Sequence, residues 1–266
     1  MSEMTHLAPV SVIIPCYRCV ETMERSLASI LNQTRQPSEI LLVDDASGDG
    51  TLELLYQLQK LHAPRIKVIP LVKNGGPGLA RNAGWNAATQ PWLAFLDSDD
   101  IWHPRKLEIQ MAWLESHPEV ALCGHSSEFL AGDIYPRVVD MPEEIRLSPL
   151  KMLISNRLPT RSVMLRRDLS FRFLGKEVTE DYLLWLEIIL SGASAYRLES
   201  CLAFSLRPDF SPGGYSGQLW THEKREIAAL RNLYAKGGLS WASFGLSAIW
   251  SLTKFLRRLW RMRNKR

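Results

Sequence analysis

Apolar and polar positions follow two periods along the first 125 residues of the chain. Short apolar runs predict buried strands at 10–14, 39–43, 66–70, 92–96 and 120–123, the first of them stopped by Pro15. Between the runs, apolar residues recur every three or four positions and predict helices through 20–31, 52–61, 80–87 and 107–114. This alternation predicts an α/β fold with a single Rossmann-like, mostly parallel sheet sandwiched by helices.

The second half of the chain is less regular. The segment 129–156 is rich in charge and proline, and its only predicted helix lies near 147–154. A strand is expected at 162–165 and a helix at 179–190, whose first turn holds Glu180 and Asp181. Acids in a first turn are favoured by the helix dipole alone, so they do not by themselves indicate a site. The segment 207–217 has the composition of a loop over a cleft.

Three carboxylates, Asp97, Asp99 and Asp100, follow the 92–96 run within four residues. Because side chains alternate along extended chain, we expect Asp97 and Asp99 on one side and Ser98 on the other. Neighbouring carboxylates repel each other unless a cation lies between them. A divalent metal, held by one or two carboxylates together with water and substrate phosphate, is the usual solution. The alternative is an N-cap for a helix that starts at 102–104.

Further polar residues are expected at the same edge of the sheet, where ligands of parallel sheets bind. Tyr17 either covers a strand end or stacks on a base, and Asp45 follows the second strand in a segment of turn composition. The loop 75–78 matches neither a P-loop nor a dinucleotide fingerprint, and we interpret it as a flexible turn. Arg81 on the following helix then either reaches a phosphate or is solvated. Together these residues favour a nucleotide-type pocket.

Composition and charge narrow the class of protein. The chain has 266 residues, 46% hydrophobic and 23% charged, as in ordinary globular proteins. Its net charge of +4 divides into −5 for residues 1–220 and +9 for residues 221–266, so nucleic acid is not an expected partner of the body. Four scattered cysteines indicate a reducing compartment, although Cys16 and Cys19 leave a redox dithiol open. Residues 1–6 lack the features of a secretory signal, which predicts a cytoplasmic location.

The motifs together resemble the inverting family 2 glycosyltransferases of the GT-A fold, over about residues 10–206. The segments that carry the resemblance are 11–17 (SVIIPCY), 43–51 (VDDASGDGT), 78–82 (GLARN), 97–100 (DSDD) and 180–181 (ED) followed by Trp185. The resemblance implies a metal-dependent hexosyltransferase domain at 1–220, with a donor half at about 8–125 and an acceptor half at about 126–220. It also implies transfer from a nucleotide sugar, with UDP favoured, to a hydroxyl of a cell-envelope or lipid-linked glycan.

The resemblance also assigns roles to individual residues. Tyr17 would stack on the donor base and Asp45 would read its edge. Asp97-Ser98-Asp99 would be the DxD motif, with Asp99 the more direct ligand of Mg²⁺ or Mn²⁺. Asp181 would be the general base. The remaining assignments are Pro15, Arg81, Asp97 and Ser98 for donor binding, and Glu180 and Trp185 for the acceptor side.

One departure from the family concerns the segment 206–215. Many relatives carry a metal-binding histidine after the catalytic helix, whereas this segment contains none. Arg207 or Asp209 would be the substitutes.

The tail at 221–266 lies outside the resemblance. A polar stripe recurs every three or four residues, and apolar residues fill much of the remainder. The uncharged stretch 239–253 is shorter than the ~20 residues that span a bilayer. Trp and Leu opposite Lys and Arg are typical of an interfacial helix on anionic lipid, which predicts a peripheral protein at the cytoplasmic membrane face. Packing of this helix on the body and a dimer contact are the alternatives.

Three other classes of protein remain open. A nucleotidyltransferase would need a glycine-rich loop after the first strand, and 15–18 (PCYR) is not one. A signalling receiver domain shares the acidic 44–45 pair, but it would have a lone phosphoacceptor aspartate instead of a DxD cluster. A non-catalytic membrane scaffold is the third alternative.

Overall fold

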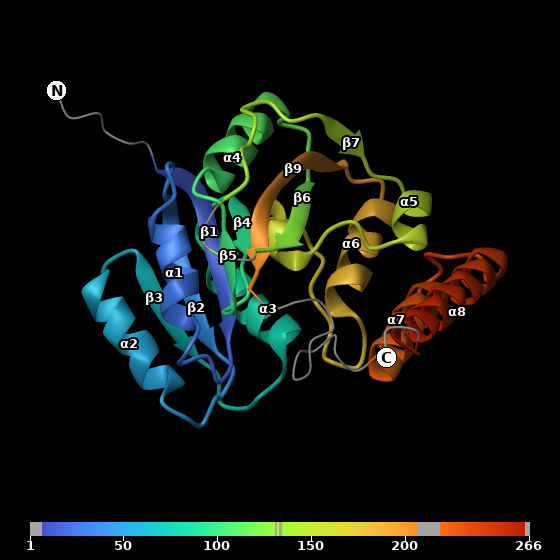
Figure 1. The fold of residues 1–266 in the computed structure, drawn as a ribbon, viewed down its shortest axis with the longest axis horizontal. Helices are drawn as coiled ribbons and strands as arrows, with labels where there is room; N and C mark the ends of the chain where they lie inside the picture. The colour runs from blue at the N-terminus through green and yellow to red at the C-terminus, as the bar shows by residue number, and fades with distance from the viewer. Residues whose placement is uncertain (1–6, 131, 133–134, 207–218, 264–266) are drawn as a thin grey trace.

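The computed structural model describes residues 7–130, 132, 135–206 and 219–263. Within these residues, nine strands form one sheet in the order β3-β2-β1-β4-β8-β6-β9-β5, with β7 paired to β9 (Figure 1). The strands are β1 (Ala8–Cys16), β2 (Pro37–Asp44), β3 (Ile66–Pro70), β4 (Trp92–Phe95), β5 (Asp100–Trp102), β6 (Leu122–Phe129), β7 (Glu144–Arg146), β8 (Met164–Arg166) and β9 (Ala195–Ser205).

The sheet changes character halfway across. The pairs β1–β2, β2–β3 and β1–β4 are parallel, as the alternating pattern predicts. Beyond β4 the sheet is mixed: β8 runs antiparallel to β4 and β6, and β9 runs parallel to β6 but antiparallel to β5 and β7. The α/β class is confirmed, and the antiparallel pairs come from strands 5, 7 and 9, which lack a clear period in the sequence.

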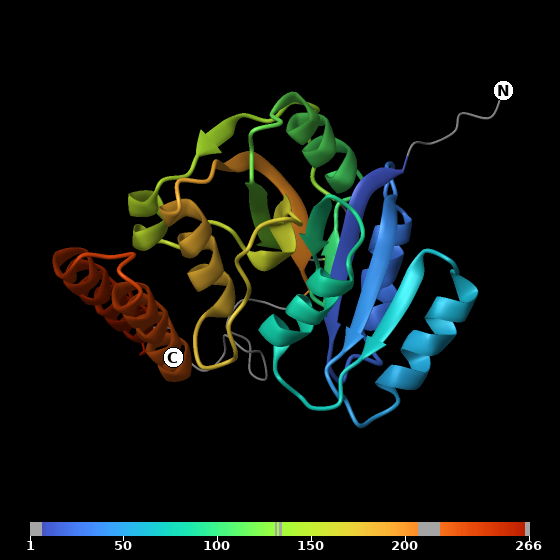
Figure 2. The same cartoon turned by 180° about the vertical axis from the view of Figure 1, so that it is seen from behind.

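The parallel half is buried on both faces because side chains alternate along each strand. Ile13 and Phe95 pack with α3 (Pro77–Ala87) and α6 (Glu180–Leu190). The neighbours Val12 and Ile14 point to the other face, against α1 (Met23–Leu31), α2 (Thr51–Leu61) and α4 (Lys106–Ser116). Figure 1 shows α1 in front of the sheet, and Figure 2 shows α3 in front of the opposite face.

Two expected boundaries are wrong. Strand β1 does not stop at Pro15 but continues to Cys16. Pairing with β4 ends at Ile13, so the proline nitrogen lies on a side of β1 that has no partner strand. The chain after the acidic cluster forms β5, and α4 begins only at Lys106 with Arg105 as its N-cap. The acidic cluster therefore does not cap a helix.

The C-terminal helices α7 (Leu219–Ala235) and α8 (Trp241–Arg263) lie together at the end of the molecule opposite α2 (Figure 1). Helix α7 packs on α6, and α8 packs on α7 and on α5 (Pro149–Ile154). Helix α8 turns its polar side inward: Ser247 and Ser251 are buried, and Lys254 Nζ lies 2.8 Å from Glu226 Oε1. Packing on the body, one of the alternatives, is therefore present on this side.

The outer side of α8 is apolar. Its exposed large hydrophobic residues are Trp241, Leu246, Ile249, Trp250, Leu252, Leu256, Leu259 and Trp260. We call this set the α8 apolar face. No helix in the described part of the chain has the length and hydrophobicity needed to cross a membrane.

Candidate active site

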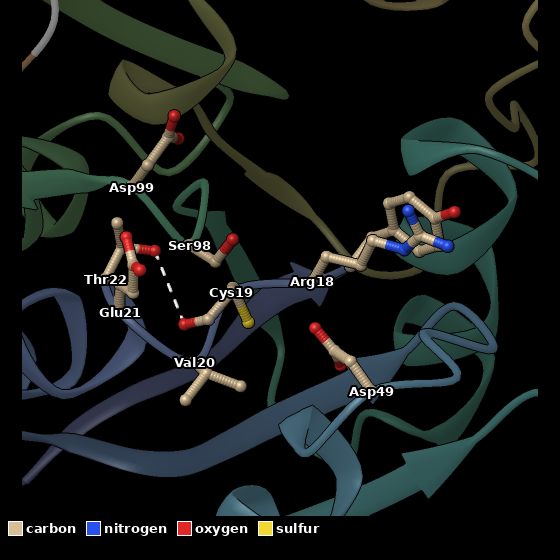
Figure 3. Close-up of a pocket in the computed structure, with 9 residues that line it drawn as sticks. Arg18, Cys19, Val20, Glu21, Thr22, Asp49, Ser98 and Asp99 are labelled. Atoms are coloured by element: carbon tan, nitrogen blue, oxygen red, sulfur yellow. Dashed lines mark hydrogen bonds between the residues drawn. The ribbon is translucent and has the colours of Figure 1, made fainter.

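A first cavity of about 430 Å³ lies beyond the carboxyl ends of β1 and β4 (Figure 3). Tyr17, Ser98 and Asp99, three of the predicted site residues, line it together with Asp49 and Cys19. Figure 3 shows Asp99 and Asp49 on opposite sides, with Ser98 and Cys19 between them. Asp97, Asp45, Arg81 and Pro15 do not line this cavity. The sequence therefore predicted the location of the cavity, but only part of its wall.

The carboxylates of Asp97 and Asp99 do not share one side of an extended chain. The chain turns at Ser98, and the Asp100 nitrogen donates to the Asp97 carbonyl oxygen at 3.1 Å. Because the alternation of an extended strand does not apply in a turn, Asp99 faces the first cavity while Asp97 Oδ1 accepts from Arg81 Nη2 at 2.5 Å. The expected juxtaposition of the two carboxylates is wrong.

Arg81 is neither solvated nor directed into the first cavity. Its side chain is 5% exposed and bridges Asp97 on one side and Glu180 Oε1, at 3.3 Å, on the other. Burial alone lowers the pKa of Arg81, but these two carboxylates raise it, so the guanidinium remains charged. Gly78 makes this approach possible, because a Cβ there would lie 2.9 Å from Glu180 Cγ. Arg81 thus fastens the DxD segment to the first turn of α6.

Asp45 holds a loop in this structure. Its carboxylate is buried and accepts from the backbone nitrogens of Gly75 and Gly76, both at 2.8 Å, and from Asn74 Nδ2 at 3.0 Å. Burial raises the pKa of Asp45. Gly76 has φ of +88°, which favours glycine, and directly precedes α3. The loop 75–78 is therefore fixed by Asp45 instead of being a flexible turn, and reading of a base by Asp45 stays a prediction.

Tyr17 and its neighbours provide an open platform at the rim. Tyr17 is 46% exposed, whereas Pro15 is buried within β1. Arg18 has φ of 50°, and its nitrogen donates to Ser47 Oγ at 3.2 Å. Such backbone conformations are held by the surrounding structure and concentrate at functional sites. The exposed ring of Tyr17 is available for stacking.

The dithiol alternative involves the same rim. Cys16 and Cys19 are both buried, and Cys19 lines the first cavity. A hydrogen bond with Cys16 lowers the pKa of Cys19, while burial raises the pKa of Cys16. A redox function of this pair stays a prediction.

A second cavity, of about 710 Å³, contains Asp181. Asp181 Oδ2 accepts from Thr160 Oγ1 at 3.1 Å and from Asn156 Nδ2 at 3.5 Å. The wall is drawn from β6, residues 155–161, α6, β9 and α7. Four residues of the wall that the sequence did not single out are Arg157, Arg161, Arg197 and His222. They occupy no shared period or motif, so no signal in the sequence could have brought them together.

Glu180 and Trp185 do not lie on the wall of the second cavity. Glu180 is buried against Arg81, because its position in the first turn of α6 points it toward α3. Trp185 is fully buried, packs against Phe95 and Phe173, and donates from Nε1 to the Leu158 carbonyl oxygen at 3.1 Å. The assignment of both residues to an acceptor-binding surface is therefore wrong, and both support the site from behind.

The two cavities are connected through ion pairs. Arg161 lines the second cavity, and its Nη1 lies 2.6 Å from Oδ2 of Asp100, the residue after Asp99. Burial raises the pKa of Asp100 to about 7, although Arg161 opposes this shift. The Asp97–Arg81–Glu180 bridge makes a second connection, which ends next to Asp181. The DxD segment is thus held on both sides by arginines that join the two halves of the sheet.

The residues of the first cavity fit a hard divalent cation. Asp99 offers carboxylate oxygens and Ser98 a hydroxyl at the cavity wall, with Asp97 beside them. Among the described residues, no group of three His, Cys, Asp or Glu side chains is placed to hold a metal alone. Mg²⁺ is usually held by one or two carboxylates plus substrate phosphates, so a partial donor set is the one expected here. Arg207 and Asp209, the suggested substitutes for a lid histidine, and the loop 207–217 lie outside the described residues.

Comparisons with known proteins identify the family. A model described as Glycosyl transferase family 2 matches residues 11–173. WfaP of Escherichia coli, named UDP-Glc:alpha-D-GlcNAc-diphosphoundecaprenol beta-1,3-glucosyltransferase, is 32% identical over 191 residues, covering 70% of this chain and 72% of WfaP.

Two solved structures share the fold. TarS from S. aureus, in complex with UDP-GlcNAc, has a TM-score of 0.70 at 20% identity and covers 94% of this chain and 72% of its own. The mannosyltransferase PcManGT from Pyrobaculum calidifontis, in complex with GDP-Man and Mn²⁺, has a TM-score of 0.69 at 17% identity, with 98% and 76% covered. The family match rules out the nucleotidyltransferase and receiver-domain alternatives. Because that match extends over more than half of the sequence, the chain belongs to glycosyltransferase family 2 and has the GT-A fold.

Proposed function

We propose that this glycosyltransferase moves a sugar from a UDP-sugar to a hydroxyl of a lipid-linked, cell-envelope glycan, with inversion at the anomeric carbon. The observation that carries the proposal is the pairing of two cavities: Asp99 lines the first, Asp181 lines the second, and buried arginines fix one relative to the other. A transferase that joins two substrates in one step needs both reacting groups held at a constant separation.

The first cavity binds the donor in this proposal. Tyr17 stacks on the base, and Asp99 with Asp97 holds Mg²⁺ or Mn²⁺ against the diphosphate. The UDP-Glc in the name of WfaP and the UDP-GlcNAc bound to TarS support a UDP-sugar, and the Mn²⁺ of PcManGT supports a divalent metal. A metal at this position would act as a Lewis acid that stabilises the leaving diphosphate.

Asp181 is the general base in the second cavity. One oxygen, Oδ2, accepts from Thr160 and Asn156, which orients the carboxylate and leaves its remaining lone pairs for an acceptor hydroxyl. A positioned base contributes roughly 10²–10⁴-fold to the rate. The β-linkage in the name of WfaP, formed from an α-linked UDP-sugar, supports inversion by a single displacement.

The C-terminal hairpin places the enzyme on the cytoplasmic face of a membrane. The α8 apolar face is exposed, and the tail from 221 to 266 carries eleven Lys and Arg against two Asp and Glu. Apolar side chains bordered by cations complement the acyl boundary and head groups of an anionic bilayer. The diphosphoundecaprenol in the name of WfaP supports an acceptor that resides in such a membrane.

A panel of nucleotide sugars tests the donor and the metal together. We expect one UDP-sugar to raise the melting temperature of the wild type only with Mg²⁺ or Mn²⁺, because a ligand bound to the native state stabilises it. In Asp99→Asn the stabilisation by metal should disappear, since a neutral amide is a poor ligand for these ions. A donor response that is independent of metal, or unchanged in Asp99→Asn, would contradict the assignment of the first cavity. The scaffold alternative predicts no donor hydrolysis at all.

A further inference from the structure

Arg157 lines the second cavity as a cation without a counter-ion. Its guanidinium makes no hydrogen bond or ion pair within the described part of the chain, and its Nε atom is buried. The two other arginines of the cavity are paired: Arg161 with Asp100, at 2.6 Å, and Arg197 with Glu199, at 3.6 Å. A buried donor without a partner is costly unless a ligand satisfies it. The unmatched positive charge of the cavity is therefore at Arg157.

The surroundings of Arg157 change from apolar to polar along four residues. Ile154, at the end of α5, is exposed, and its carbonyl oxygen accepts from Nε1 of Trp250, a member of the α8 apolar face, at 2.8 Å. Ser155 and Asn156 come next, and both line the second cavity. Asn156 donates to Asp181, so the segment 154–157 leads from the apolar surface to the wall that contains the base.

A smaller cavity continues this path on the other side. It measures about 190 Å³, shares Ser155, Asn156 and Asp181 with the second cavity, and reaches Lys254 and Arg258 on α8. Lys254 is paired with Glu226, so this cavity is polar without a strong excess of one charge. The order of chemistry across the surface is thus carboxylate base, free cation, and exposed apolar helix.

We propose that Arg157 binds the diphosphate group of a lipid-linked acceptor, with the acceptor sugar toward Asp181 and the lipid toward the α8 apolar face. This inference rests on the proposed function for the reaction, and it adds the acceptor class and the residue that selects it. A planar guanidinium can donate two parallel hydrogen bonds to phosphate oxygens, which a lysine cannot do. A cavity of about 710 Å³ is within the range that holds a drug-sized group such as a sugar with its diphosphate.

Alternative anions fit the same surroundings less well. A uronic acid carboxylate matches the cation but not the adjoining apolar surface. Glu128 and Asp181 also line the second cavity and repel a phosphate, which leaves the Arg157 end as the favourable position for it. An amphiphile that carries sugar, diphosphate and lipid in that order matches all three parts of the surface.

Direct binding of geranyl diphosphate tests the inference without donor, metal or turnover. In calorimetric titrations with EDTA, we expect the wild type to bind geranyl diphosphate and Arg157→Gln to bind it at least tenfold more weakly. Arg157→Lys should be intermediate, because it keeps the charge but not the fork. Arg146→Gln, an exposed arginine on β7 outside both cavities, is the matched control and should bind like the wild type. Melting temperatures would confirm that each variant is folded.

Two further arms separate the sources of phosphate. Binding of UDP with Mn²⁺ should be unchanged in Arg157→Gln, and so should flotation with phosphatidylglycerol vesicles. A loss confined to UDP would assign Arg157 to the donor, and a loss confined to vesicles would assign it to phospholipid head groups; either result overturns the inference. Equal binding of geranyl diphosphate by wild type and Arg157→Gln, or no binding by either, also overturns it.

Kinetics with paired acceptors sharpen the result. Arg157→Gln should raise KM at least tenfold for a sugar linked to a lipid diphosphate and leave KM unchanged for an alkyl glycoside of the same sugar. Equal KM changes for both acceptors would contradict a role in diphosphate recognition. If the wild type transfers no sugar from any UDP-sugar, the proposed function fails, whereas the geranyl diphosphate titration still decides the role of Arg157.

Discussion

The first cavity takes its wall from the loops that follow β1, β2 and β4, whereas the second collects side chains from five elements spread over nearly a hundred residues. The first is acidic and small-lined, with Asp49 and Asp99 at its wall. The second contains three arginines, of which one is unpaired. One half of the sheet thus offers carboxylates for a metal, and the other offers cations for an anionic ligand.

This difference shows how one sheet serves two substrates of like charge. A donor diphosphate needs a cation, and the first cavity can obtain one only from solution, because Arg81 is already engaged by Asp97 and Glu180. The second cavity keeps its own cation in Arg157. The two sites therefore differ in whether positive charge is supplied by a bound metal or by the chain.

The largest effect should come from the base. We expect Asp181→Asn to fold, to bind donor and metal as the wild type does, and to lose at least ~100-fold in kcat, about 2.7 kcal/mol of transition-state stabilisation. If Asp181 only complements the helix dipole, the substitution should cost a few tenths of a kcal/mol to ~1 in stability, with near-normal turnover. Radiometric transfer assays and thermal unfolding distinguish these results.

The control for this substitution has to be chosen from the structure. Glu180→Gln is unsuitable, because Glu180 belongs to the buried bridge with Arg81. Asp168 is exposed and lies outside both cavities, so Asp168→Asn should keep wild-type kcat. A stable Asp181→Asn enzyme that transfers sugar at the wild-type rate would remove the base from the second cavity and end the proposed division between the two sites.

The next effect concerns the connection between the cavities. Arg81→Met should lower the free energy of unfolding by about 3–5 kcal/mol, because it leaves Asp97 and Glu180 as uncompensated carboxylates. Denaturant titration measures the loss. Arg35→Met, which breaks the exposed pair with Glu115, is the matched control and should cost no more than ~1 kcal/mol. Equal losses in the two variants would show that the Arg81 bridge is not what holds the halves together.

The two cavities also differ in how much of them the sequence predicts. Tyr17, Ser98 and Asp99 could be placed because strand ends in consecutive β–α units meet at one edge, which local periodicity reveals. The partners of Arg81 could not, because Asp97 and Glu180 are 16 and 99 residues away and come together only when α3 packs on α6. Likewise Arg157 and Arg197 meet only after β6 and β9 pair, and β9 has no clear period in the sequence.

A smaller effect should follow from changing the α8 apolar face. The combined substitution Leu246→Ser, Leu256→Ser and Trp260→Ser should weaken binding to anionic vesicles at least tenfold, because burial of each such side chain contributes up to roughly 1.5–3 kcal/mol. Flotation with and without phosphatidylglycerol measures it.

Leu61→Ser with Val72→Ser removes exposed apolar side chains from the donor half and serves as the control. If the α8 variant instead changes the sedimentation mass of the wild-type protein while vesicle binding stays the same, the face is a dimer contact.

The smallest effect concerns Lys106, beneath the wall between the cavities. Lys106 is fully buried, with Nζ 4.0 Å from the centroid of Trp102, and the Trp102 Nε1 atom donates to the Arg161 carbonyl oxygen at 2.8 Å. Burial lowers the pKa of Lys106 from 10.5 to about 7. Between these values the unfolded chain holds the proton and the folded chain does not, so stability should rise with pH by up to ~1.4 kcal/mol per unit. Lys106→Met should remove this slope relative to wild type in denaturant titrations at pH 7, 8 and 9, and parallel slopes in the two proteins would mean that Lys106 stays protonated beneath Arg161.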